Sequence, residues 1–208
     1  MPRNSEVSRK KILSVAEKIF AEKGFDGSRV DEIANQAGVN KALIYYYFKS
    51  KSLILEEIFN NLLQEATELL KRYLSDDLEF FQDKTMEQAF DLYIDYLSGK
   101  KDILKILLTE SLKSGEDSPP LFNLVETAIS QEADSLIKSM RQKGINIAEQ
   151  KDQIMVTEFF TGIMPIINYV VFKDKWCKHF QLNKDMLRDM FFEAYRATHI
   201  AYHKSSVK

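Results

Sequence analysis

Apolar residues recur at helical spacing along most of the chain, and turn residues separate the stretches in which they do so. The first stretch covers residues 12–20, and its helix is expected to end at Gly24. A second helix with Ser28 as its N-cap is expected to end at Gly38, and Asn40 to cap a third. The first fifty residues therefore predict three short helices.

The same pattern predicts six more helices after Ser50, which is expected to cap the first of them. They cover, in order, about residues 51–75, 85–98, 101–113, 119–143, 151–173 and 184–203, with Asn183 as the last N-cap. No alternating run favours a strand, so the chain is expected to be all-α. We expect two domains, a three-helix domain over residues 1–50 and a helical domain over residues 51–208.

Composition narrows the class of protein. Of 208 residues, 45% are hydrophobic and 29% are charged, which excludes a disordered chain. A single cysteine excludes an intramolecular disulfide framework and indicates a reducing compartment. The longest uncharged run, residues 159–172, is shorter than a bilayer requires, and the N-terminus lacks a signal-peptide pattern. We therefore expect a soluble cytoplasmic protein without membrane contact.

Charge is distributed unevenly along the chain. Residues 1–51 carry ten basic and six acidic side chains, so this part has a formal charge of +4 within a chain of net charge −2. A basic N-terminal part on an acidic body suggests that the N-terminal part faces a polyanion.

Residues 30–49, VDEIANQAGVNKALIYYYFK, have the spacing of a helix-turn-helix unit. Such a unit needs a small residue where its helices cross, a left-handed residue at the turn, and an apolar residue that packs back. Ala34, Gly38 and Ile44 fill these positions. A plain helical hairpin fits the same spacing, but it would leave a ring among residues 45–47 exposed without purpose. We therefore favour a second helix whose start enters the major groove of DNA.

The segment from about residue 8 to residue 58 resembles the TetR family of bacterial transcriptional regulators. The resemblance rests on Gly24-Phe25, on the turn Gly38-Val39-Asn40-Lys41, and on the run Ile44-Tyr45-Tyr46-Tyr47-Phe48-Lys49-Ser50-Lys51. Ser52 and Tyr47 depart from the family, which often has Glu and His there, although Tyr47 can still reach a phosphate. Beyond this segment, only the number and length of the helices match.

The resemblance implies DNA contacts at the starts of the second and third helices. Lys41 and Ala42 correspond to positions near base edges, where Lys can donate to guanine and Ala can touch a thymine methyl. Tyr45 corresponds to a ring against bases or the sugar–phosphate backbone, and Asn40 lies on the same surface. Phosphate contacts, which set the register without reading sequence, are expected from Ser28, Arg29, Tyr46, Tyr47 and Lys51.

The helix expected over residues 151–173 is apolar nearly all round, so it needs neighbours on more than one side. Family members with nine helices dimerise through a bundle of the last two helices of each subunit, and the resemblance implies the same here. A single short recognition helix also rarely gives enough affinity alone, which favours a homodimer. The expected interface residues are Gly162, Ile166, Leu187, Phe191, Ala194 and Thr198.

Most aromatic residues lie beyond residue 51, and the resemblance implies that some of them bind a small apolar or amphipathic effector. The candidates are Phe90, Tyr93, Tyr96, Glu110, Phe122, Met155, Glu158, Phe159 and Tyr169. Each apolar candidate also fits an ordinary core. Glu110 and Glu158 could meet a cationic effector, pair with a lysine, or face solvent.

We expect a homodimeric repressor that a small effector releases from a palindromic double-stranded operator. The alternative is a DNA-binding structural or interaction protein without an effector. No phosphate loop, paired cysteine motif or nucleophile–base arrangement favours an enzyme, and no cofactor is expected. Cys177 and His179 are expected in a loop. His199 and His203 have a spacing that could hold a metal, but a helix C-terminus favours His anyway, so no metal site is expected.

Overall fold

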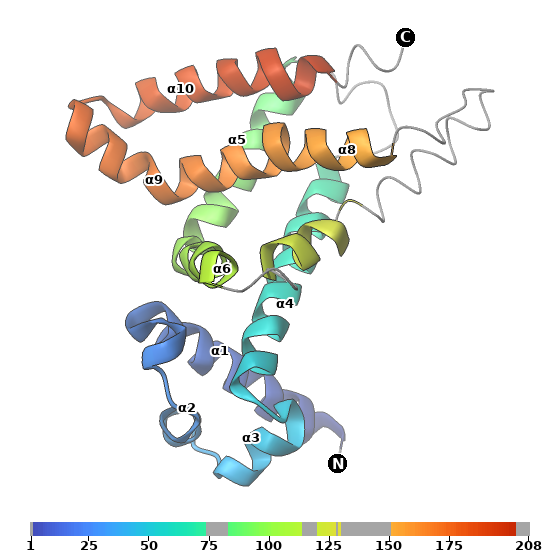
Figure 1. The fold of residues 1–208 in the computed structure, drawn as a ribbon, viewed down its shortest axis with the longest axis vertical. Coiled ribbons are helices and arrows are strands. Elements are labelled where there is room, and N and C mark those ends of the chain that lie inside the picture. Colours follow the sequence, from blue (N-terminus) through green and yellow to red (C-terminus); the bar gives the residue numbers. More distant parts are fainter. Residues whose placement is uncertain (1, 74–82, 114–119, 128, 130–150, 203–208) are drawn as a thin grey trace, which may run out of the picture. The chain divides into compact units, whose positions relative to one another are not determined.

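The computed structural model describes residues 2–73, 83–113, 120–127, 129 and 151–202. Every regular element in these ranges is helical, which confirms the all-α prediction (Figure 1). The chain forms two compact units, Met1–Gln64 with Asp102–Phe122, and Glu65–Lys101 with Asn123–Lys208. The predicted helix over residues 119–143 is helical at residues 120–127 and 129, and its remainder lies outside the described residues.

The first unit is built from short helices around one apolar core. It contains α1 (Pro2–Gly27), α2 (Val30–Ala37), α3 (Lys41–Phe48), the start of α4 (Lys51–Tyr73) and most of α6 (Lys101–Lys113). Gly24 interrupts α1 with φ 74° and ψ 168°, at the position where the sequence predicts the end of the first helix. The core includes Ile12, Ile19, Phe20, Ile33, Ile44 and Ile54, each at most 1% exposed.

The second unit contains α5 (Asp83–Gly99), α8 (Lys151–Thr157), η2 (Glu158–Ile163), α9 (Met164–Phe180), α10 (Lys184–Tyr195) and η3 (Arg196–Ile200). The elements η2 and η3 are π-helical turns, which hold one residue more than an α-helical turn. α8, η2 and α9 form one continuous helix, and α9 lies beside α10 (Figure 1). The caps predicted for α4 and α10 are confirmed, because Ser50 Oγ and Asn183 Oδ1 each accept a backbone N–H of the following turn.

The predicted end of the long helix near residue 173 is wrong. The helix continues to Phe180 and ends at Gln181 in the left-handed region. Cys177 and His179 therefore lie within α9 and not in a loop, and the buried Cys177 shows that the helix still packs on its own unit there.

The same helix corrects a second expectation. The segment Asp152–Phe180 has 29 residues and a mean hydropathy of 1.6 in its most apolar window, so it is long and apolar enough to cross a membrane. Counting only uncharged runs missed this, because a spanning helix tolerates one or two charges within its length. Buried helices of water-soluble proteins pass the same test.

The two π turns pack against each other through Gly162 and His199. A Cβ atom added to Gly162 would lie 2.7 Å from His199 Cε1, so only glycine allows this approach. The imidazole is buried, with Nδ1 3.0 Å from Thr161 Oγ1 and Nε2 3.6 Å from Glu158 Oε2. His203, whose spacing from His199 could hold a metal, lies outside the described residues, and no group of three potential metal ligands occurs within them.

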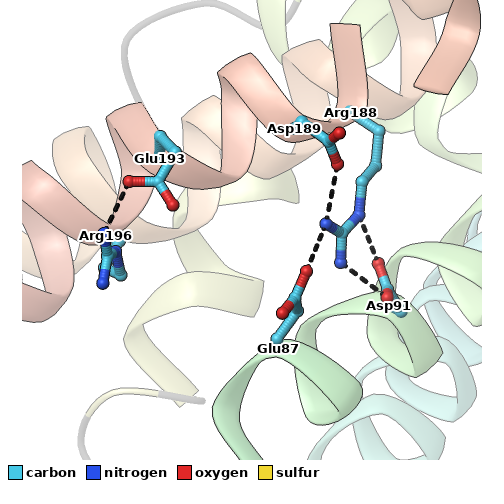
Figure 2. Close-up of polar contacts among 6 residues, drawn as sticks. All are labelled: Glu87, Asp91, Arg188, Asp189, Glu193 and Arg196. Atoms are coloured by element: carbon cyan, nitrogen blue, oxygen red, sulfur yellow. Dashed lines mark hydrogen bonds and ion pairs between the residues drawn. The ribbon is translucent and has the colours of Figure 1, made fainter. Parts of the chain in front are cut away.

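A guanidinium cluster ties α10 to α5 in the second unit. Arg188 donates two hydrogen bonds to Asp91, at 2.8 and 2.6 Å, and one to Glu87 at 2.6 Å (Figure 2). The guanidinium also lies 5.2 Å from the ring centre of Phe192, which is buried. Paired, stacked arginine of this kind fixes two helices in register more strongly than a single exposed ion pair does.

Candidate nucleic-acid interface

The turn between α2 and α3 has the geometry that the sequence predicts. Gly38 lies in the left-handed region at φ 64° and ψ 35°, and its N–H bonds to Asn35 O at 3.2 Å. Asn40 Oδ1 then accepts the Leu43 N–H at 2.7 Å and starts α3, so only three residues lie between α2 and α3. A left-handed glycine followed at once by a side-chain cap is what allows so short a connection.

Each helix of this unit buries one face and exposes the other. Ala34 is 3% exposed, and Ile44 and Phe48 anchor the inner face of α3 at 1% and 3% exposure. Successive residues of a helix are rotated by about 100° around its axis. With Ile44 and Phe48 on the buried side, the side chains at positions 41, 42, 45 and 46 lie on the exposed side. Tyr45 and Tyr46 are 43% and 77% exposed.

The expected DNA contacts fall into three groups by exposure. Arg29, Asn40, Lys41, Ala42, Tyr45 and Tyr46 are exposed, Tyr47 and Lys51 are half-buried, and Ser28 is buried. The exposed group comes from the loop before α2 and the first turns of α3, so it lies on one helix-turn-helix unit. The side chains of the other two groups bond to the protein itself.

Ser28 does not cap α2, which corrects the cap expected from the sequence. Its hydroxyl donates to Phe25 O at 2.6 Å, and the N-cap of α2 is Arg29, whose side chain makes no capping bond. Lys51 Nζ donates to Phe25 O at 2.7 Å and to Ser28 O at 3.1 Å. Ser28 and Lys51 thus close the connection between α1 and α2, and any phosphate contact by them stays a prediction.

Two tyrosines of α3 pack edge to face, with the ring centres of Tyr46 and Tyr47 5.3 Å apart. The Tyr47 hydroxyl donates to Ser5 Oγ at 3.0 Å, so this ring supports the start of α1. The Tyr46 ring stays largely in solvent, as expected for a ring that is not needed for the core.

The acidic first turn of α2 pairs with both neighbouring helices. Lys41 Nζ lies 2.8 Å from Asp31 Oδ1 and 3.0 Å from Asp31 Oδ2, and this hydrogen bond raises the pKa of the lysine. Glu32 pairs with Lys23 of α1. Asp31 was not among the residues expected at this surface from the sequence. The signal was an acid in the first turn of one helix and a base in the first turn of the next, which the helix-turn-helix geometry brings together.

The effector candidates lie in different surroundings. Phe90 is buried, with its ring centre 5.0 Å from Phe192. Tyr169 stacks on Phe191 at 4.3 Å, and burial raises the pKa of its phenol. The Tyr96 hydroxyl donates to Glu65 at 2.8 Å. These rings belong to the second unit, together with the half-buried Tyr93, Met155, Glu158 and Phe159.

Two effector candidates belong to the first unit. Glu110 pairs with Lys113 at 3.0 Å, which is the lysine pairing left open in the sequence analysis. Phe122 is 54% exposed.

The expected interface residues also divide. Gly162 and Ile166 are buried within the subunit, Leu187 and Phe191 are half-buried, and Ala194 and Thr198 are exposed. The sequence analysis missed a set of large exposed apolar side chains on the same helices: Val156, Phe160, Phe172, Trp176, Phe180, Met186 and Met190. Their spacing by four residues was the available signal.

A helix-turn-helix that exposes the start of its second helix defines a DNA-binding protein. Residues 12–58 match the sequence model of the bacterial regulatory proteins of the tetR family. The chain is 29% identical over 160 residues to the transcriptional repressor NicS of Pseudomonas putida, which is 75% of this chain and 72% of that protein. The chain is therefore similar to TetR-family transcriptional regulators, and the likeness is most specific over its helix-turn-helix.

Two further proteins show the same likeness. IcaR of Staphylococcus aureus, the negative transcriptional regulator of the biofilm operon icaADBC, is 45% identical over 47 residues, 23% of this chain and 25% of that protein. The crystal structure of a transcriptional regulator from Aquifex aeolicus has the same fold, with a TM-score of 0.61 at 21% identity. That match covers 91% of this chain and 98% of the other.

Proposed function

We propose that the chain is a homodimeric cytoplasmic repressor, which binds a palindromic DNA operator and leaves it when a small apolar or amphipathic effector binds. The observation that carries DNA recognition is the exposed start of α3, where Lys41, Ala42, Tyr45 and Tyr46 share the outer side of a firmly anchored helix. NicS and IcaR are named as a repressor and a negative regulator, which supports repression here.

The surface of α9 and α10 supports a homodimer. Phe172, Trp176 and Phe180 follow one another at four-residue spacing on α9 and are 48–54% exposed. Met186 and Met190 are likewise exposed at four-residue spacing on α10, which packs beside α9. Large apolar side chains that are exposed together mark interaction sites, and a second copy would cover them with an identical set.

The dimer also accounts for the high hydropathy of the continuous helix. Lys173, Asp174, Lys175 and Lys178 stand among the exposed rings near its C-terminal end. Charges at such a density are costly inside a bilayer but fit the polar rim of a protein interface. We therefore place this helix in a subunit interface and the protein in the cytoplasm, where it reaches DNA.

An effector is supported by incompletely buried rings in the second unit. Tyr93, Phe159 and Tyr169 are half-buried, while Phe90 of the same unit is buried. Rings that keep part of a face accessible within a largely apolar helical unit suit an apolar or amphipathic ligand.

Selection of bound fragments from a random duplex library tests DNA recognition. We expect enriched fragments with two inverted half-sites, separated by one helical turn or a multiple of it. A matched variant, Lys41→Ala with Tyr45→Ala, keeps the buried face of α3 and should lose enrichment at the base positions. Enrichment of single half-sites would overturn the dimer, and no enrichment at all would overturn the proposed operator binding.

A further inference from the structure

An ion pair stands on the surface that carries the expected base contacts. Lys41, the first residue of α3, places its ammonium between both carboxylate oxygens of Asp31, at 2.8 and 3.0 Å. The side chain of Lys41 is 49% exposed and that of Asp31 63% exposed. A negative charge therefore lies beside the side chain that has to meet a polyanion.

The number of N–H donors on the Lys41 ammonium determines whether the lysine can contact DNA while it stays paired with Asp31. Lysine has three N–H donors, and a carboxylate that holds one or two of them leaves at least one free. Lys41 can therefore stay on Asp31 and donate to guanine O6 or N7 in the major groove. A backbone phosphate is anionic, in contrast, and an ammonium that stayed on Asp31 while binding it would hold two negative charges close together, so contact with a phosphate favours breaking the pair.

Breaking the Lys41–Asp31 pair costs little free energy, but the cost arises only on some DNA sequences. An exposed pair of this kind is worth roughly a factor of two to five in an equilibrium constant. That factor is lost on any DNA where Lys41 can only bind phosphate, and it is kept where the correct base is present. The carboxylate also repels phosphates in every complex, but it does so alike on all sequences.

We propose that Asp31 is a specificity-determining residue, which holds Lys41 for base contacts and prevents it from acting as a general phosphate contact. The inference rests on the proposed operator binding. It assigns a role to an acidic residue on a DNA-facing surface, where charge alone would only weaken binding.

The test compares wild-type protein with Asp31→Asn on two duplexes of equal length, the fragment selected by the wild type and a random sequence. Asn keeps the size of the side chain and removes its charge. We expect the ratio of the two affinities to fall two- to fivefold, and the salt dependence on random DNA to steepen by about one phosphate contact.

Two controls separate the pair from net charge. Asp102→Asn removes the carboxylate of another exposed lysine–aspartate pair in the same unit, with Lys105, and should leave the ratio unchanged. In a Lys41→Ala background, Asp31→Asn should no longer change the ratio. An unchanged ratio in the single variant, or an equal change without Lys41, overturns this inference alone. Failure of the wild type to select any fragment overturns the proposed function and the inference together.

Discussion

The side chain of Lys51, which was expected to contact DNA, binds backbone carbonyls of its own unit. Two of its ammonium donors bond to Phe25 O and Ser28 O, and the charge lies 4.2 Å from the ring centre of Phe25. Phe25 O lies in the last turn of α1 and also accepts the N–H and the hydroxyl of Ser28, and Ser28 lies between α1 and α2. The lysine therefore sets the position at which the helix-turn-helix begins.

Lys51→Met tests this role at the scale of one residue. The variant keeps the side-chain stem and removes the charged donor, so we expect the free energy of unfolding to fall by about 1–3 kcal/mol. Urea denaturation of the variant and of Lys18→Met, an exposed lysine of α1, measures the difference. A stable Lys51→Met protein with a shallower salt dependence of DNA binding would instead make Lys51 a phosphate contact.

At the scale of elements, boundaries set by local chemistry could be predicted and those set by distant contacts could not. Gly38, Asn40, Ser50 and Asn183 mark helix ends through bonds within one turn, so the sequence pattern located them correctly. The π turns depend on a contact between residues 162 and 199, which no local pattern contains.

The candidate site shows the same division. The exposed face of α3 followed from helical spacing, because the buried residues of a helix fix which side remains outside. The commitment of Ser28 and Lys51 to the α1–α2 connection did not, since it depends on where carbonyls 23 and 26 residues before Lys51 lie in space. The aromatic effector candidates could not be divided into core and ligand-facing residues from the sequence either, because their burial depends on residues that are distant in the sequence.

Gly162→Ala tests the contact between the π turns. The added methyl group would meet the buried imidazole of His199, which has no room to move because Thr161 holds it. We expect a loss of about 1–3 kcal/mol in the free energy of unfolding, as for other overpacked positions. Gly99→Ala is the control, since no atom lies within 4 Å of a Cβ added there. Equal stability of the two variants in urea would show that the π turns adjust freely.

At the scale of the whole molecule, the proposed dimer makes affinity depend on subunit association. The surface formed by Phe172, Trp176, Phe180, Met186 and Met190 is exposed in one subunit, so charge placed there costs the isolated subunit little. The same charge buried between two subunits would have no partner and would oppose association strongly.

Trp176→Glu is expected to give folded monomers. Operator affinity should fall by at least about tenfold, because each monomer then binds one half-site alone. Light scattering after size exclusion measures the mass, and a duplex-binding titration measures the affinity. The matched variant Leu112→Glu changes an apolar residue that is 87% exposed in the first unit and should remain dimeric. A Trp176→Glu protein that stays dimeric removes this surface from the interface.

The extra residue in the π turn η2 determines which way the side chains after it point from the helix axis. Deletion of one codon there would restore a regular α-helix and rotate everything that follows by about 100° around the helix axis. The exposed side chains of Val156 and Phe160 would then turn relative to the exposed rings of α9. His199 would also lose its place opposite Gly162. Insertions and deletions in the last two helices are therefore tolerable only as compensated pairs, so the lengths of these helices are expected to evolve together.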